Sequence, residues 1–137
     1  MESDTSVKGV EIFHSSYTSS TLANKIMYAL EKKLGMKGSP YTSETTMGIR
    51  KSPLTDDGYD LYANLRESGG RATMAGKGTP NSIKDNKSFV DANGMNAMEI
   101  DFAYISNKDD AANWKKNKTK IADETAKAFA QAIKASN

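Results

Sequence analysis

Two carboxylates stand at alternate positions of the most strand-like segment of the chain, residues 98–105 (MEIDFAYI). Because successive side chains of a strand point to opposite faces, Glu99 and Asp101 are expected to share one face. Carboxylates within reach of a scissile bond can act as general acid and general base. A solvated strand face is the commoner reason for such a pair, so the spacing alone indicates candidate residues and not a reaction.

The sequence contains few residues that could act as a nucleophile or bind a metal ion. The sequence has no Cys and one His, which excludes disulfides, a thiol nucleophile and thiolate metal ligands. A catalytic zinc site commonly takes about three protein ligands of His, Cys or carboxylate type. We therefore expect no complete zinc site within one copy of this chain. His14 ends a strand pattern on the side of Val10 and Ile12, which predicts a structural histidine with no metal role.

The elements of the N-terminal half follow from hydrophobic periodicity. Residues 7–14 (VKGVEIFH) alternate like a strand, and a helix follows from Thr18 and ends before Gly35. The apolar face of that helix is formed by Leu22, Ile26, Met27, Leu30 and Leu34. Residues 59–66 (YDLYANLR) alternate well enough for a second strand, with a short helix as the alternative. Most of the span from residue 35 to residue 94 is rich in Gly and Pro and predicts turns.

The C-terminal half combines one long polar segment with regular structure. Residues 71–94 are interpreted as a flexible insertion, because over twenty polar residues have few apolar anchors. After the strand at 98–105, Asp109 and Asp110 are expected to start a short helix through Trp114. A last helix from Thr119 is expected to turn four residues inward, Ile121, Thr125, Phe129 and Ile133. Strands that alternate with helices predict an α/β fold.

Size and charge limit the classes of partner. The chain of 137 residues is long enough for one small domain, and its 19 basic and 17 acidic residues leave a net charge of +2. That charge is too small for the basic face that binds a phosphate backbone, so no nucleic-acid partner is expected. No window approaches the roughly 20 apolar residues that span a bilayer, and the first residues do not resemble a signal peptide. We expect no membrane association.

Residues 95–107 (MNAMEIDFAYISN) resemble the late strand of zinc-dependent N-acetylmuramoyl-L-alanine amidases of the autolysin and phage-endolysin type. That family typically reads methionine-proline-alanine, two or three apolar residues and glutamate, then apolar-glycine-phenylalanine-isoleucine-serine-asparagine. The family's final helix follows, as residues 121–133 do here. Of the matching segments, the Ile-Ser-Asn strand with its helix is the most specific.

The resemblance extends upstream of this strand. Residues 9–13 (GVEIF) and the helix that follows them through residue 34 are similar to the family's earlier strand and its "serine, leucine-alanine" helix. Residues 61–68 look like the strand that precedes the catalytic one. The match implies half of an amidase-type α/β domain, a partial mixed β-sheet flanked by helices, and residues 1–137 are read as this single partial domain. It also implies a peptidoglycan hydrolase, whose parent cleaves the amide between N-acetylmuramic acid and L-alanine.

The resemblance implies zinc in the parent family and its loss here. Family members hold zinc with two histidines and one glutamate, all of which precede the strand matched by residues 9–13. None of those positions exists in this chain, so no zinc is expected to be held tightly by this chain alone. The family's acid/base glutamate corresponds to Asp101 in an alignment without gaps, and Glu99 takes that place only if the register shifts. Asp is one methylene shorter than Glu, which predicts inactivity or weakened catalysis.

Three interpretations of function follow. The first is a fragment of a cell-wall hydrolase that acts on peptidoglycan, at the bacterial cell wall or outside the cell, together with a missing N-terminal half. The second is a non-catalytic wall-binding or partner-binding module with the same half-fold. The third is a small α/β protein unrelated to the amidases. Without the first half of the sheet, an open strand edge also predicts self-association.

Overall fold

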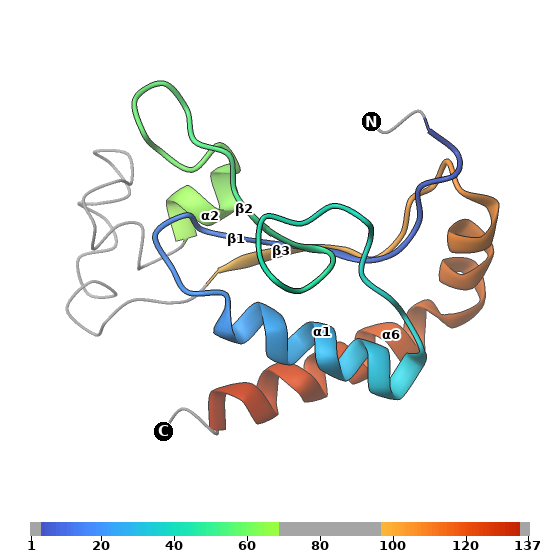
Figure 1. Cartoon of the computed structure of the whole chain (residues 1–137). Helices are drawn as coiled ribbons and strands as arrows, with labels where there is room; N and C mark the ends of the chain where they lie inside the picture. Colours follow the sequence, from blue (N-terminus) through green and yellow to red (C-terminus); the bar gives the residue numbers. More distant parts are fainter. Residues whose placement is uncertain (1–3, 69–96, 135–137) are drawn as a thin grey trace. The chain divides into compact units, whose positions relative to one another are not determined.

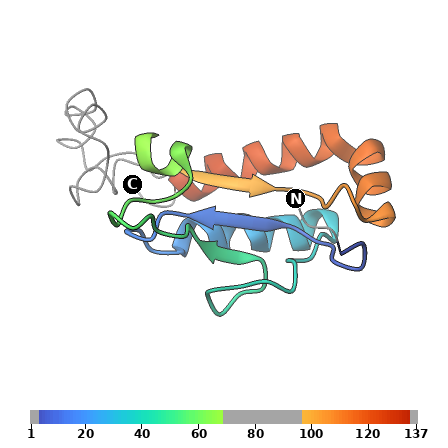
Figure 2. The ribbon, with the colours of Figure 1, turned by 90° about the horizontal axis from the view of Figure 1, so that it is seen from above.

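The computed structural model of the chain describes residues 4–68 and 97–134. In chain order, the elements are β1 (Glu11–His14), α1 (Thr21–Leu34), β2 (Ile49–Lys51), α2 (Ala63–Ser68), β3 (Met98–Asp101) and α6 (Lys108–Lys134). The three strands form one sheet in the order β2-β1-β3, and Figure 2 shows β3 running opposite to β1. This mixed sheet with helices confirms the predicted α/β fold.

The chain divides into two compact units. The first unit comprises Met1–Ile12, Thr21–Ile49 and Ile100–Asn137, and the second comprises Phe13–Ser20 and Arg50–Glu99. Each unit is described by itself below. The predicted insertion at 71–94 lies outside the described residues. Within those residues, no helix combines the length and the apolar character needed to cross a membrane.

Helix α1 forms in the first unit as its apolar spacing predicts. Its inward face consists of Ala23, Ile26, Met27 and Leu30, which recur at intervals of three and four residues and are at most 1% exposed. The helix stops where Gly35 adopts a φ of 65°, a conformation that is strained for residues with a Cβ. The Gly35 and Met36 amides then donate hydrogen bonds to the Glu31 and Leu30 carbonyls.

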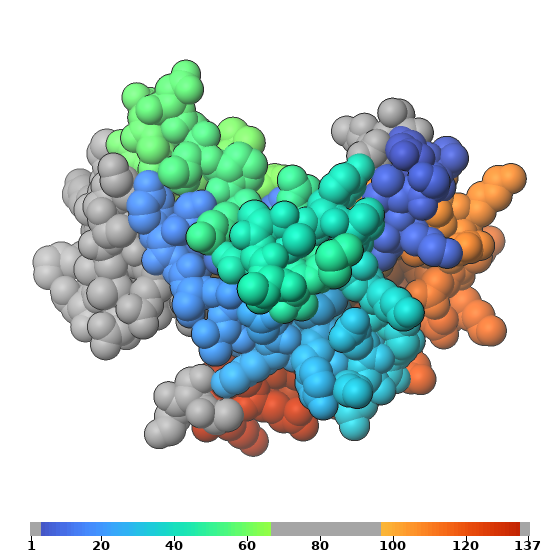
Figure 3. Space-filling view, in the orientation of Figure 1, coloured from blue at the N-terminus to red at the C-terminus, as the bar shows by residue number. Residues whose placement is uncertain are grey.

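The segment between α1 and β2 depends on close approach of backbones. Val10 pairs in parallel with Gly38, and the Ile12 amide donates to the Gly48 carbonyl at 2.8 Å. A Cβ added at Gly48 would lie 2.3 Å from the Val10 carbonyl oxygen, and Gly48 has a φ of 75°. Residues 36–48, cyan to teal in Figure 3, lie against α1. Sequence periodicity did not predict β2, because three residues are too few to display alternation.

Helix α6 is one continuous helix of 27 residues, so the prediction of two separate helices was wrong. The junction between Trp114 and Thr119 contains three lysines and one asparagine but no Gly or Pro, and nothing there interrupts the helix. Figure 1 shows α6 beside α1, against which it packs in the first unit. The buried residues of α6 are Ile121, Thr125, Ala128 and Ala132.

The inward face of α6 differs from the predicted one at its C-terminal end. Phe129 is only half-buried, and Ile133 is 54% exposed. At roughly 100° per residue, Ala132 returns to within about 20° of the direction of Ile121, whereas Ile133 lies about 120° away. The spacing of four residues used in the prediction drifts off the helix face after two turns.

In the second unit, residues 59–66 do not form the predicted strand. The antiparallel bridge between Leu54 and Asp60 is followed by α2, so the helical alternative is the correct one. The Tyr62 carbonyl accepts hydrogen bonds from the Leu65 and Arg66 amides, which closes the first turn of this helix. The apparent alternation is too short to distinguish a strand from a helix.

Candidate functional site

Asp101 is the last residue of β3 and is exposed. It lines a cavity of about 520 Å³ that is formed within the first unit. The other lining residues are Glu11, Ile100, Phe102, Ala103, Tyr104, Ile105, Ser106 and Trp114. The strand predicted for 98–105 ends early, because the Tyr104 amide donates to the Asp110 carboxylate at 3.0 Å. The chain after Asp101 therefore bends into the wall of the cavity.

A buried polar cluster forms one side of this cavity. Glu11 in β1 is only 5% exposed, and its Oε1 accepts a hydrogen bond of 2.7 Å from the Ser39 hydroxyl. Burial raises the pKa of the Tyr104 hydroxyl well above its usual range, and a hydrogen bond to Glu11 acts in the same direction. Tyr104 is therefore held in its neutral form beside Glu11. A side chain whose pKa is strongly shifted, beside a buried carboxylate in a cavity, is typical of functional sites.

Sequence reasoning did not single out Glu11 as a site residue. Its only local signal is a charged residue between the two apolar residues Val10 and Ile12. Its partners Ser39 and Tyr104 come from segments far away in the sequence. Their convergence depends on the fold and leaves no periodic pattern.

Two aromatic rings form another part of the cavity wall. Phe102 and Trp114 stack with ring centroids 5.7 Å apart and planes inclined by 20°. Trp114 extends from the second turn of α6 and remains 38% exposed. The cavity therefore combines carboxylates with an aromatic surface that solvent can reach.

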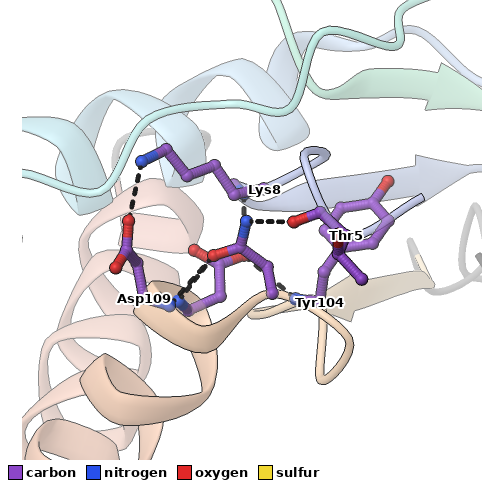
Figure 4. A network of polar contacts seen from close by, with 7 residues as sticks. Thr5, Lys8, Tyr104 and Asp109 are labelled. Atoms are coloured by element: carbon purple, nitrogen blue, oxygen red, sulfur yellow. Dashed lines mark hydrogen bonds and ion pairs between the residues drawn. The ribbon is translucent and has the colours of Figure 1, made fainter. Parts of the chain in front are cut away.

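The start of α6 is held by the network in Figure 4. The Asn107 Oδ1 accepts hydrogen bonds from the amides of Asp109 (3.0 Å) and Asp110 (3.2 Å), as an N-cap residue does. Its Nδ2 donates to the Thr5 carbonyl at 2.8 Å. The Asp110 carboxylate also accepts the Gly9 amide at 2.8 Å. The asparagine of the Ile-Ser-Asn motif thus has a structural role, which fixes the segment that carries Tyr104.

Glu99 and Asp101 differ in their surroundings. Glu99 is half-buried, belongs to the second unit and is not among the described residues that line the cavity. Asp101 belongs to the first unit and lines it. Of the two carboxylates predicted from the strand pattern, Asp101 is the one that this cavity includes.

The second unit brings together His14, Ser15 and Asp60, three residue types that occur in catalytic triads. The Ser15 hydroxyl donates directly to Asp60 at 2.5 Å, and the Ser16 amide donates to the same carboxylate at 2.9 Å. His14 Nδ1 lies 2.9 Å from the Ser15 carbonyl oxygen, not from its hydroxyl. Because the Ser15 hydroxyl donates to Asp60 and all three side chains are at most 2% exposed, we interpret this cluster as one that secures the turn after β1.

Zinc does not fit the donors of the described residues. Among residues 4–68 and 97–134, no three His, Cys, Asp or Glu side chains are grouped so that they could hold a metal ion. His14 is buried, and its Nδ1 is near the Ser15 carbonyl and the Thr18 hydroxyl.

No protein-family model, no curated protein and no solved structure matches this chain. The function of this chain therefore has to be inferred from its own residues.

Proposed function

We propose that this chain is the C-terminal half of a zinc-dependent N-acetylmuramoyl-L-alanine amidase domain that acts on peptidoglycan. The observation that supports the proposal most is the position of Asp101, the residue matched to the family's acid/base glutamate. It ends β3, it is exposed, and it lines a cavity. The segment after it leads within a few residues to the N-cap of α6, in the order that the resemblance requires.

The chemistry assigned to Asp101 is proton transfer during hydrolysis of an amide. A general acid or base must come within hydrogen-bond reach of the group that gains or loses the proton. An exposed carboxylate at the end of a strand is accessible to a polymeric substrate, whereas Glu11 is buried. The shorter side chain of Asp would set its carboxylate roughly 1 Å or more behind that of a Glu.

The missing half has to supply the metal site. In the resemblance, two histidines and one glutamate hold the zinc, and all three would come from the N-terminal half. Bound zinc would activate the attacking water. Peptidoglycan is the proposed substrate, and the bacterial cell wall or the extracellular space is the proposed site of action. Alone, the chain is proposed to be inactive.

The decisive experiment supplies the N-terminal half of a family amidase in trans. We expect release of stem peptides from peptidoglycan by the mixture and none by either half. Asp101→Asn should lower turnover by about a hundredfold or more, and Asp101→Glu should match or exceed the parent. The matched control is Asp123→Asn, which removes an exposed carboxylate of α6 outside the cavity and should leave turnover unchanged.

Two outcomes would contradict this assignment. If Asp101→Asn leaves turnover unchanged while Glu99→Gln abolishes it, the register is shifted and Glu99 is the acid/base residue. If the mixture binds zinc but hydrolyses no wall, the chain is a non-catalytic module instead. Cosedimentation of the chain with peptidoglycan then distinguishes wall binding from partner binding.

A further inference from the structure

The cavity that contains Asp101 has an unusual combination of linings. Among the described residues around it, Glu11 and Asp101 carry carboxylates, and none is Lys or Arg. The remaining wall is mainly aliphatic and aromatic, including the stacked pair Phe102 and Trp114. Its volume of about 520 Å³ is in the range of small-molecule sites.

This lining favours a cation with an apolar body. Glu11 and Asp101 both contribute negative charge to the wall of the cavity, which favours a cationic ligand over an anionic one. Aromatic rings add to the attraction, because a cation over the face of a tryptophan is stabilised by its quadrupole. A bare metal ion is disfavoured, because the described residues contain no group of three suitable ligands. An aliphatic ammonium satisfies both the charge and the apolar wall.

Glu11 and Asp101 contribute differently to the cavity. Glu11 is nearly buried and accepts a hydrogen bond from Ser39, so it contributes mainly through its charge. Asp101 is exposed at the end of β3, where a ligand can reach it. Trp114, at 38% exposure, has ring surface that can cover a methylene chain.

We propose that this cavity binds an alkylammonium group on an aliphatic stem, such as the lysine side chain of a peptide. Asp101 pairs with the ammonium, and Trp114 packs against the methylenes. The inference goes beyond the proposed amidase function and does not depend on it. Binding requires neither zinc nor the missing half, so a failure of the amidase assay leaves this site to be judged by its own test.

Trp114 is the only tryptophan of the chain, so its fluorescence reports directly on the cavity. The probe is Nα-acetyl-L-lysine N-methylamide, titrated into the full chain. We expect a saturable change with a dissociation constant in the millimolar range. The matched ligand is the Nε-acetylated analogue, which keeps the stem and removes the charge. It should bind at least about fivefold more weakly, as expected when one exposed ion pair is lost.

A variant pair tests the carboxylate. Asp101→Asn should weaken binding of the lysine probe about fivefold, whereas Asp123→Asn, with the same change in net charge, should alter it less than about twofold. Circular dichroism verifies the fold of both variants. Should Asp101→Asn fail to fold, the two ligands with the parent chain still decide the question.

Several results would overturn the proposal. They are the absence of saturation with the lysine probe, equal affinity for its acetylated analogue, or equal effects of the two variants. N-Acetylglucosamine is titrated in parallel, since exposed aromatic rings also bind sugars. Tighter binding of the sugar than of the lysine probe would identify a saccharide site instead.

Discussion

The hydroxyl of Tyr104 is held as a neutral donor by its surroundings. Burial disfavours the tyrosinate form, and the negative charge of Glu11 opposes a second negative charge beside it. A hydrogen bond to a charged acceptor contributes about 1.5–3 kcal/mol when it is well formed. The contact joins β1 to the segment after β3, both of which belong to the first unit. Tyr104 therefore stabilises the cavity wall only while it keeps its proton.

The pH dependence of stability follows from the sign of this shift. The pKa of Tyr104 is higher in the folded chain than in the unfolded chain, so its contribution is complete below the unfolded value of roughly 10. The contribution is lost as the pH rises above that value toward the folded pKa. Tyr104→Phe should cost about 1 kcal/mol or more at neutral pH. It should also flatten the fall in unfolding free energy as the pH rises above about 10.

Urea denaturation at several pH values measures this effect. Tyr28→Phe is the control, because Tyr28 is 62% exposed on α1, and it should follow the parent curve. A Tyr104→Phe curve as steep as that of the parent would show that the hydroxyl does not retain its proton in the fold.

At the scale of elements, Asn107 connects the start of α6 to the N-terminal segment. Its side chain accepts hydrogen bonds from two helix amides and donates one to the Thr5 carbonyl. Asn107→Ala should therefore destabilise the chain by about 1–2 kcal/mol, which is the upper range for loss of an N-cap. Thermal or urea unfolding followed by circular dichroism measures the change.

Two variants separate capping from other effects at this position. Asn113→Ala, on an exposed site within α6, should be neutral or slightly stabilising, because Ala is the better helix former. Asn107→Asp keeps the acceptor for the helix amides but loses the donor to Thr5, so its cost should be intermediate. Equal costs for Asn107→Ala and Asn107→Asp would mean that the bond to Thr5, and not the cap, stabilises this junction.

Local patterns predicted the elements that carry their own signals. Helix α1 combines a four-residue buried stripe with a glycine stop, and both are visible in the sequence. The short strand β2 is different, because it exists through backbone pairing that Gly48 permits beside Val10. The prediction divides helix α6 at the polar, lysine-rich residues 115–118, where the helix continues without a break. Polarity marks exposure but does not end a helix unless a breaker is present.

The residues of the candidate site also fall into those that local sequence patterns predicted and those that they did not. Asp101 was predicted from a strand pattern and a family resemblance, both of which are local in sequence. The partnership of Glu11, Ser39 and Tyr104 was not predicted, because it joins three segments that meet only in the folded first unit. Trp114 had no predicted role at all. Its contribution to the cavity depends on the continuity of α6 with the turn that Asn107 caps.

For the molecule as a whole, the supply of metal ligands limits what one copy can do. The chain contains one His and no Cys, and that histidine is 2% exposed in the second unit. Carboxylates remain, but a zinc site made only of scattered carboxylates lacks the nitrogen and sulfur ligands typical of tight zinc sites. Tight binding of zinc by one copy is therefore unexpected on chemical grounds.

We predict that the isolated chain binds zinc no more tightly than about micromolar, as measured by calorimetry. His14→Gln should leave this weak affinity unchanged, because the buried ring already contacts the Ser15 carbonyl and would have to leave the fold to reach a metal. Addition of the N-terminal half should raise the affinity by orders of magnitude, and Asp101→Asn should not reduce it, since a proton-transfer residue is not a ligand. A nanomolar, one-to-one affinity in a monomer would mean that this chain has a complete zinc site of its own, and the missing-half proposal would then be wrong.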